Sequence, residues 1–153
     1  MFSKSCEYAI RALICISLHS KNDEKVNLKI VAESINAPLP FITKILQKLV
    51  KHNLLHSRKG PNGGFFISEE VRNKTILDIV KCIDGNSLLN DCVMGLKRCN
   101  EKTPCPLHFQ YKSIKMNLID LFDKSTIEDM KEKIGSCKFF LNIEQTQQES
   151  LNS

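Results

Sequence analysis

The chain has 153 residues, a formal net charge of +5 and 42% hydrophobic residues. This is the length and composition of a single globular domain, which excludes a multidomain enzyme and a disordered polymer. Seven cysteines, an odd number, argue against a closed disulfide framework, and the first residues show no apolar signal-peptide core. No apolar run reaches the roughly 18 residues of a membrane span. We therefore expect a cytoplasmic protein without a membrane partner, whose cysteines are ligands, redox groups or core residues.

The positive charge is concentrated in the first half of the chain. Residues 1–74 carry twelve Lys and Arg against six Asp and Glu, whereas residues 75–153 carry ten against eleven. A basic surplus confined to one half is typical of a protein that binds a polyanion such as nucleic acid, although a solvated basic face has the same composition.

Three amphipathic helices are predicted in this half from apolar residues spaced three and four apart. The first covers about 4–19 and the second about 28–35, and the third opens at Pro40 and ends at a left-handed Asn53. Two short helices joined by a tight turn form a helix-turn-helix, whose second helix enters the major groove of DNA. The residues of this helix that we predict to face DNA are Pro40, Thr43, Lys44, Gln47, Lys48 and Lys51.

A β-hairpin is predicted directly after the third helix, in the position of the wing of a winged helix. Asn62-Gly63 lies between two β-prone runs, and both residues tolerate the positive φ of a two-residue turn. Arg58 and Lys59 at the base of the hairpin are placed for contact with the DNA backbone or minor groove. We include Asn62 and Gly63 in the predicted DNA contact. A glycine-rich phosphate loop is the competing interpretation, but no Gly-Lys-Ser/Thr follows. Residues 1–74 are thus predicted to form a winged helix-turn-helix.

Residues 75–90 are predicted to be a connecting helix and turn, opened by a capping box of Thr75 and Asp78. The loop 91–108 that follows has few apolar residues to bury, yet it contains three cysteines and a histidine: Cys92, Cys99, Cys105 and His108. Closely spaced thiolates can converge on one metal centre, either an iron–sulfur cluster or a Cys3His zinc site. The spacing lacks the Cys-x2-Cys pairs of common zinc sites and favours iron–sulfur. Three unmetallated thiols are the remaining interpretation.

A long helix is predicted after the loop, because apolar residues recur at steps of four and three on one face: Leu107, Tyr111, Ile114, Leu118 and Leu121. Such a face packs either in the core or on a partner helix, and in so small a chain we favour a second copy, forming a homodimer. Residues 107–135 would then contain the dimerisation helix and a short helix opened by a capping box of Ser125 and Glu128. The composition of 142–153 predicts a disordered tail.

Together these features resemble the IscR/NsrR-type family of bacterial winged-helix regulators, the Rrf family, from about Lys4 to Ile134. The resemblance is carried by residues 7–13, 41–46 and 60–65 and by the three-cysteine loop. It implies a mainly α fold, with a small β-hairpin wing and a long C-terminal dimerisation helix. It further implies a homodimer on a pseudo-palindromic double-stranded DNA operator, and a [2Fe–2S] or [4Fe–4S] cluster on the three loop cysteines.

The fourth cluster ligand has two candidates in this sequence. Some family members use a histidine just after the third cysteine, which matches His108, and others use a carboxylate of the first helix from the partner subunit, which matches Glu7. Glu7 could equally pair with Arg11 one turn on, and Cys6 is a further candidate ligand. The other cysteines lie on or beside apolar stripes and are predicted core residues: Cys15, Cys82 and Cys137.

The predicted function is a transcription regulator, a repressor, whose operator binding responds to redox state, nitric oxide or iron–sulfur status through the cluster. A zinc-stabilised structural DNA-binding module is the alternative, followed by a small iron–sulfur electron carrier, which would have little use for a basic helix-turn-helix. The sequence shows no nucleophile–base pair, phosphate cradle or acid pair. We therefore expect no enzyme activity and no small-molecule substrate.

Overall fold

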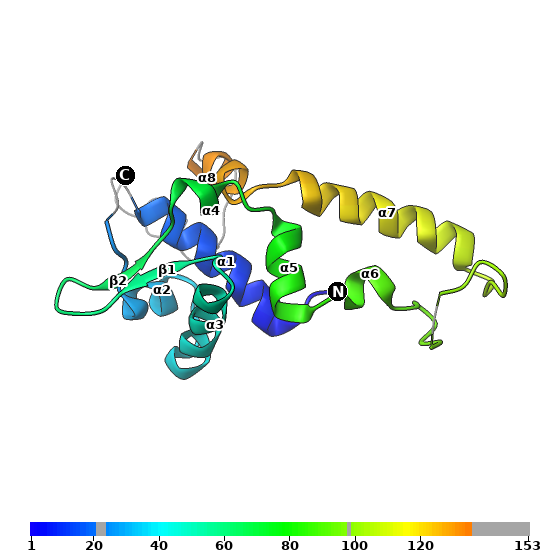
Figure 1. The fold of residues 1–153 in the computed structure, drawn as a ribbon, viewed down its shortest axis with the longest axis horizontal. Helices are drawn as coiled ribbons and strands as arrows, with labels where there is room; N and C mark the ends of the chain where they lie inside the picture. Colours follow the sequence, from blue (N-terminus) through cyan, green and yellow to red (C-terminus); the bar gives the residue numbers. More distant parts are fainter. Residues whose placement is uncertain (21–23, 98, 136–153) are drawn as a thin grey trace, which may run out of the picture.

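The computed structural model describes residues 1–20, 24–97 and 99–135 and confirms the mainly α winged-helix fold (Figure 1). Cys137 and the tail 142–153 lie outside the described residues. The elements in chain order are α1 (Lys4–His19), α2 (Leu28–Ser34), α3 (Leu39–Lys51), β1 (His56–Arg58), β2 (Gly64–Phe66), α4 (Glu69–Arg72), α5 (Ile76–Asp84), α6 (Ser87–Asn90), α7 (His108–Lys124) and α8 (Ile127–Gly135). The short helices α4 and α6 were not expected from the sequence.

Helix α1 lies in the middle of the body, which consists of α1 to α5, the two strands and α8 (Figure 1). Helices α2, α3, α5 and α8 pack against α1. Its buried residues are therefore not confined to one stripe: Cys6, Ala9, Ala12, Leu13, Ile14, Cys15, Ile16 and Ser17. Several of these side chains are small, which allows neighbouring helices to approach α1 from different sides.

Helices α2 and α3 form the helix-turn-helix, and each ends in a left-handed asparagine. Asn36 (φ 50°) follows α2, where the amides of Asn36 and Ala37 donate to the carbonyls of Glu33 (3.1 Å) and Ala32 (2.9 Å). Asn53 (φ 58°) follows α3, as predicted. These caps satisfy the last carbonyls of both helices and fix the direction in which the chain leaves each one.

The wing consists of β1 and β2, which pair antiparallel with Arg58 opposite Gly64. Val26, just before α2, forms a bridge to Phe65 through two backbone hydrogen bonds of 2.7 and 2.9 Å. Gly64 lies so close to Val26 that an added Cβ would come 2.8 Å from the Val26 carbonyl oxygen. The wing is thus anchored to the body beside this glycine.

The turn of the wing differs from the predicted one. Asn62 and Gly63 do not adopt positive φ; the wing glycines that do are Gly60 (φ 110°) and Gly64 (φ 147°). The loop covers residues 59–63, and within it the amide of Gly63 donates to the carbonyl of Gly60 (2.9 Å). Because Gly64 is already held beside the body, the strand pair closes there and leaves a loop longer than two residues.

An arm, defined here as α6, the loop 91–107 and α7, extends away from the body (Figure 1). The arm is connected to the body through α5, which begins at the predicted capping box. The amide of Thr75 donates to the Asp78 carboxylate (3.0 Å), and the Asp78 amide donates to the Thr75 hydroxyl (3.2 Å). The loop 91–107 lies at the end of the arm farthest from the body (Figure 1).

At the base of the arm, the end of α7 meets the start of α5. The carbonyl of Ser125 accepts a hydrogen bond from the amide of Ile76 (2.8 Å), and the carbonyl of Lys74 accepts one from the amide of Ile127 (3.1 Å). These strand-like bonds join the two ends of the arm to one point of the body.

The predicted capping box of Ser125 and Glu128 is wrong by one residue. Thr126 and Asp129 form it, because the Thr126 amide donates to the Asp129 carboxylate (2.8 Å) and the Asp129 amide donates to the Thr126 hydroxyl (3.0 Å). The hydroxyl of Ser125 instead donates to the carbonyl of Leu121 (2.7 Å), one turn back in α7. None of the described helices is both long and apolar enough to cross a bilayer.

The wing turn yields a stability prediction. A Cβ on Gly63 would lie well inside the van der Waals distance of the Arg58 carbonyl oxygen. We expect Gly63→Ala to distort the turn at a cost of about 1–3 kcal/mol, and the exposed Asn62→Ala to be nearly neutral. Thermal unfolding of the two variants measures this difference. Equal stability of Gly63→Ala and the parent protein would contradict the tight turn.

Candidate nucleic-acid interface and metal centre

Helix α3 buries an apolar side and presents a polar, basic side to solvent. Its buried residues are Ile42, Ile45, Leu46 and Leu49. The residues predicted to face DNA lie on the other side, all exposed except the half-buried Thr43: Pro40, Thr43, Lys44, Gln47, Lys48 and Lys51. Short polar side chains flanked by lysines suit a helix that contacts base edges and phosphates together.

Two of the lysines on this face differ in their surroundings. Lys44 has no hydrogen-bond or ion-pair partner among the described residues. The ammonium of Lys48 donates to the carbonyl of Ile83 (3.1 Å), at the carboxyl end of α5. A cation at that position satisfies an end carbonyl and opposes the negative end of the helix dipole. The Lys48 side chain therefore connects the recognition helix to α5 as well as facing outward.

A second contact joins α5 to α1 at the same place. The carboxylate of Asp84 accepts hydrogen bonds from the backbone amide of Ser3 (2.9 Å) and from the Ser3 hydroxyl. This contact between Ser3 and Asp84 was not predicted from the sequence. A serine before one helix and an acid at the end of another carry no periodic signal, since their meeting depends on how α1 and α5 cross.

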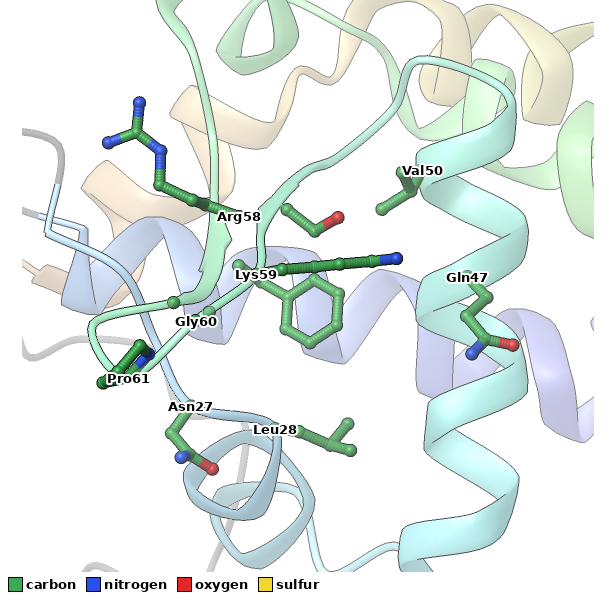
Figure 2. Close-up of a pocket in the computed structure, with 12 residues that line it drawn as sticks. Asn27, Leu28, Gln47, Val50, Arg58, Lys59, Gly60 and Pro61 are labelled. Atoms are coloured by element: carbon green, nitrogen blue, oxygen red, sulfur yellow. The ribbon is translucent and has the colours of Figure 1, made fainter.

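A cavity of about 530 Å³ separates the wing from α3 (Figure 2). The side chain of Lys59 extends from the wing towards Gln47 and Val50 of α3, whereas Arg58 points away from α3 (Figure 2). The two basic residues of the wing are thus placed for contacts on opposite sides of it. Asn62 is exposed and Gly63 is half-buried in the turn beside them.

The first pair of candidate metal ligands is Cys99 and His108. The Cys99 Sγ lies 3.2 Å from His108 Nδ1. His108 is only 3% exposed, although it is the first residue of α7, and its Nε2 is buried without a hydrogen-bond partner. A buried imidazole with one nitrogen on a thiol and the other unpaired is a suitable soft-metal ligand.

Cys92 and Cys105 form the second pair. The backbone amides of Met94 and Leu96 lower the pKa of the Cys92 thiol by stabilising the thiolate, with smaller contributions from a hydrogen bond of Cys105 and the charge of Lys115. A lowered pKa favours the thiolate that metals bind.

The donor set of this loop fits an iron–sulfur or zinc centre in chemistry, since it offers three thiols and one imidazole. In this structure, however, the four donors lie as two pairs, Cys99 with His108 and Cys92 with Cys105, and do not form one closed site. In the part of the chain that the structure describes, no three His, Cys, Asp or Glu side chains converge as they would around a metal ion.

Glu7 is not near this loop within one protomer, because α1 lies in the body and the loop lies at the far end of the arm (Figure 1). Its carboxylate forms an ion pair with Lys4 (2.9 Å) and not with Arg11, as the alternative interpretation of Glu7 had it. Arg11 instead donates to the carbonyl of Ile35 at the end of α2 (2.8 Å). The Glu7 side chain is 44% exposed and so remains accessible to another molecule.

Cys6 does not qualify as a ligand, because it belongs to the core. It is fully buried, and burial, together with the nearby Asp84 carboxylate, raises the pKa of its thiol to about 12. Cys15 is likewise buried, and Cys82 is half-buried against the core, as predicted for both.

Helix α7 presents apolar side chains to solvent along the predicted face. Leu107, Ile114 and Leu121 are 45–65% exposed, and Tyr111 and Leu118 at the edge of this face are half-buried. Near its carboxyl end α7 contacts the body, where the ring of Phe122 lies 5.1 Å from that of Phe2. Two further exposed residues, Phe109 and Met116, were not predicted.

Comparisons with known proteins agree with this architecture. The family model described as Rrf2, iron-dependent transcriptional regulator, matches residues 2–133. An HTH-type transcriptional regulator of Aquifex aeolicus is 30% identical over 132 residues, covering 85% of this chain and 90% of its own. The regulator IscR of Vibrio campbellii is 24% identical over 123 residues, covering 80% and 72%.

Solved structures show the same fold. CymR, the global cysteine regulator of B. subtilis, superposes with a TM-score of 0.73 at 18% identity, covering 86% of this chain and 96% of its own. IscR of T. potens superposes with a TM-score of 0.71 at 18% identity, covering 92% of both chains.

Proposed function

Since the chain belongs to the Rrf2 family of iron-dependent transcriptional regulators, and is thus a DNA-binding regulator and not an enzyme, we propose that it is a dimeric, cytoplasmic repressor controlled by an iron–sulfur cluster. The observation that carries this proposal is the contact between Cys99 and the buried His108, in a loop that also contains Cys92 and Cys105 and leads directly into α7.

Operator binding is assigned to α3 and the wing. The helix presents Thr43, Lys44 and Gln47 to the major groove, while Arg58 and Lys59 extend from the wing to flanking backbone or minor groove. We assign α3 and the wing to neighbouring parts of the DNA because the two elements border one cavity (Figure 2). Lysines and arginine neutralise phosphates and fix the register, and the residues at the base edges select the sequence.

The homodimer is assigned to the exposed apolar face of α7, defined by Leu107, Ile114 and Leu121. Pairing two copies through this face removes the apolar surface from water and yields two recognition helices. Two half-sites must then be about 34 Å apart, so only a narrow range of relative positions of the two bodies permits binding.

The cluster is assigned to Cys92, Cys99, Cys105 and His108, with Glu7 of the partner subunit as the alternative fourth ligand. His108 is supported by its contact with Cys99 and its unpaired Nε2, and Glu7 by its accessible carboxylate. When bound, an iron–sulfur cluster supplies a redox couple and thiolate-bound iron that reacts with oxidants and nitric oxide. The same donors also fit zinc, which would make the arm a structural element.

Control of operator binding follows from the connectivity of the arm. The loop continues into α7, whose other end is hydrogen-bonded to the start of α5, and the far end of α5 contacts α3 through Lys48. A change in loop conformation can thus alter the placement of the recognition helices. A coupling of about 1–3 kcal/mol, or about 5–150-fold in affinity, is typical of such linkage.

Two of the three lysines of α3, Lys44 and Lys48, give a matched test of the DNA interface. We expect Lys44→Ala to weaken binding to all duplex sequences and to lower the salt slope by about 0.9, the value for one phosphate contact. We expect a smaller change for Lys48→Ala, because its ammonium is shared with the Ile83 carbonyl. Titration of a labelled duplex at several salt concentrations measures both slopes. An unchanged slope for Lys44→Ala contradicts its phosphate contact.

The ligand assignment is tested by cluster spectroscopy of anaerobically purified variants. Cys99→Ala should remove the visible absorbance and leave a folded protein, because Cys99 lies in an exposed loop outside the core. Cys15→Ser, in the core, is the control that should keep the absorbance wherever the protein folds. Retained absorbance in Cys99→Ala contradicts the assignment.

The fourth ligand is decided by comparing His108→Ala with Glu7→Ala. We expect His108→Ala to change the cluster spectrum and Glu7→Ala to leave it unchanged. The reverse result assigns the ligand to Glu7 of the partner subunit, and no change in either variant assigns it to a group outside these two residues.

A further inference from the structure

We propose that α3 selects A·T base pairs, with the methyl group of Thr43 packed against the C5 methyl of a thymine and the carboxamide of Gln47 paired with an adenine. This inference rests on the DNA-binding role of α3 proposed above and names the bases that the helix reads. It depends on which atoms of the Thr43 and Gln47 side chains are free to contact DNA bases.

The hydroxyl hydrogen of Thr43 is already used within α3. Its hydroxyl donates to the carbonyl of Leu39, one turn back in α3, at 2.7 Å. Because the hydroxyl hydrogen is engaged with the backbone, the side chain is fixed about χ1 and its methyl group is the part that remains available. Thr43 is half-buried and lies on the outward side of α3, between Pro40 and Gln47. An apolar group at this position complements the thymine methyl, a feature of the major groove that no other base carries.

Gln47 lies one turn further along the same side and is exposed. Its carboxamide makes no hydrogen bond to any of the described residues. A glutamine amide offers a donor and an acceptor side by side, which matches the N7 and N6 atoms of adenine. Thr43 and Gln47 are therefore suited to the two members of A·T pairs.

Few residues of α3 are of the types that read G·C pairs. Helix α3 contains no Arg, Asp or Glu, the residue types that pair with guanine or accept from cytosine. Of its lysines, Lys48 is held at the Ile83 carbonyl, and Lys51 is the last residue of the helix, away from the amino-terminal half that contacts base edges. Lys44 is exposed on the same outward side as Gln47, and the salt-slope test above assigns its ammonium to a phosphate.

The test removes one methyl group from the DNA at a time. Operator sequences are first selected from random duplexes with anaerobically purified full-length protein. Each thymine of the selected half-site is then replaced by deoxyuridine, which lacks only the C5 methyl. We expect one position per half-site at which this replacement weakens binding about fourfold, the effect of burying about one methyl group.

Two substitutions of Thr43 separate its methyl group from its hydroxyl. Thr43→Val keeps the methyl group and should keep the preference for thymine over deoxyuridine. Thr43→Ser keeps the hydroxyl and should bind both duplexes equally. Lys44→Ala is the control, since it should lower affinity for both duplexes by the same factor. The proposal is overturned if no thymine is sensitive, if the half-site centre is selected as G·C, or if Thr43→Ser discriminates like the parent protein.

Binding to a random duplex, measured on the same preparation at several salt concentrations, distinguishes loss of thymine recognition from loss of DNA binding. Salt-dependent binding without any effect of deoxyuridine overturns the assignment of Thr43 and keeps the DNA-binding role. Absence of binding to any duplex overturns the proposed function itself.

Discussion

Helix α1 is buried by neighbours on several sides, and the rest of the structure depends on this packing. The helix-turn-helix contacts it through α2 and α3, and the base of the arm contacts it through α5 and α8. Protein interiors are close-packed, so neighbours of one buried helix cannot shift independently without opening cavities. The recognition helix and the arm are thereby positioned relative to a single element. This is the arrangement that a regulator needs if an event in the arm is to alter DNA binding.

The recognition helix, α1 and the start of the arm come together at the carboxyl end of α5. Lys48 of the recognition helix donates to Ile83, and Asp84 accepts from Ser3 before α1. The next helix, α6, already belongs to the arm that carries the cysteine loop. The candidate DNA interface and the start of the arm therefore both adjoin the carboxyl end of α5. The polar contacts of Lys48 and Asp84 can rearrange at low cost, in contrast to the apolar packing around α1.

Periodic and local features were predictable from the sequence, whereas features set by tertiary contacts were not. The spacing of apolar residues located α1, α3 and α7, and the left-handed Asn53 and the capping box of Thr75 follow from local backbone chemistry. The prediction of a two-residue turn at Asn62-Gly63 was wrong, because contact with the body fixes Gly64 and lengthens the loop. Likewise, Glu7 pairs with Lys4 because Arg11 is engaged at the end of α2.

The candidate metal centre was predictable in composition but not in arrangement. The spacing of the cysteines identified the donors, yet their association as Cys99 with His108 and Cys92 with Cys105 required the structure. The burial of His108 at the first residue of α7 was equally invisible to a pattern of apolar residues, since histidine at a helix start is ordinarily exposed.

The central claim, that an iron–sulfur cluster in the arm controls operator binding, is tested most directly by measuring metal content and operator affinity on one anaerobic preparation. We expect coloured protein containing iron and sulfide, and an operator affinity that changes by about 5–150-fold when the cluster is removed, with binding to random DNA nearly unchanged. Colourless protein with stoichiometric zinc, or an operator affinity unaffected by loss of the cluster, would contradict it.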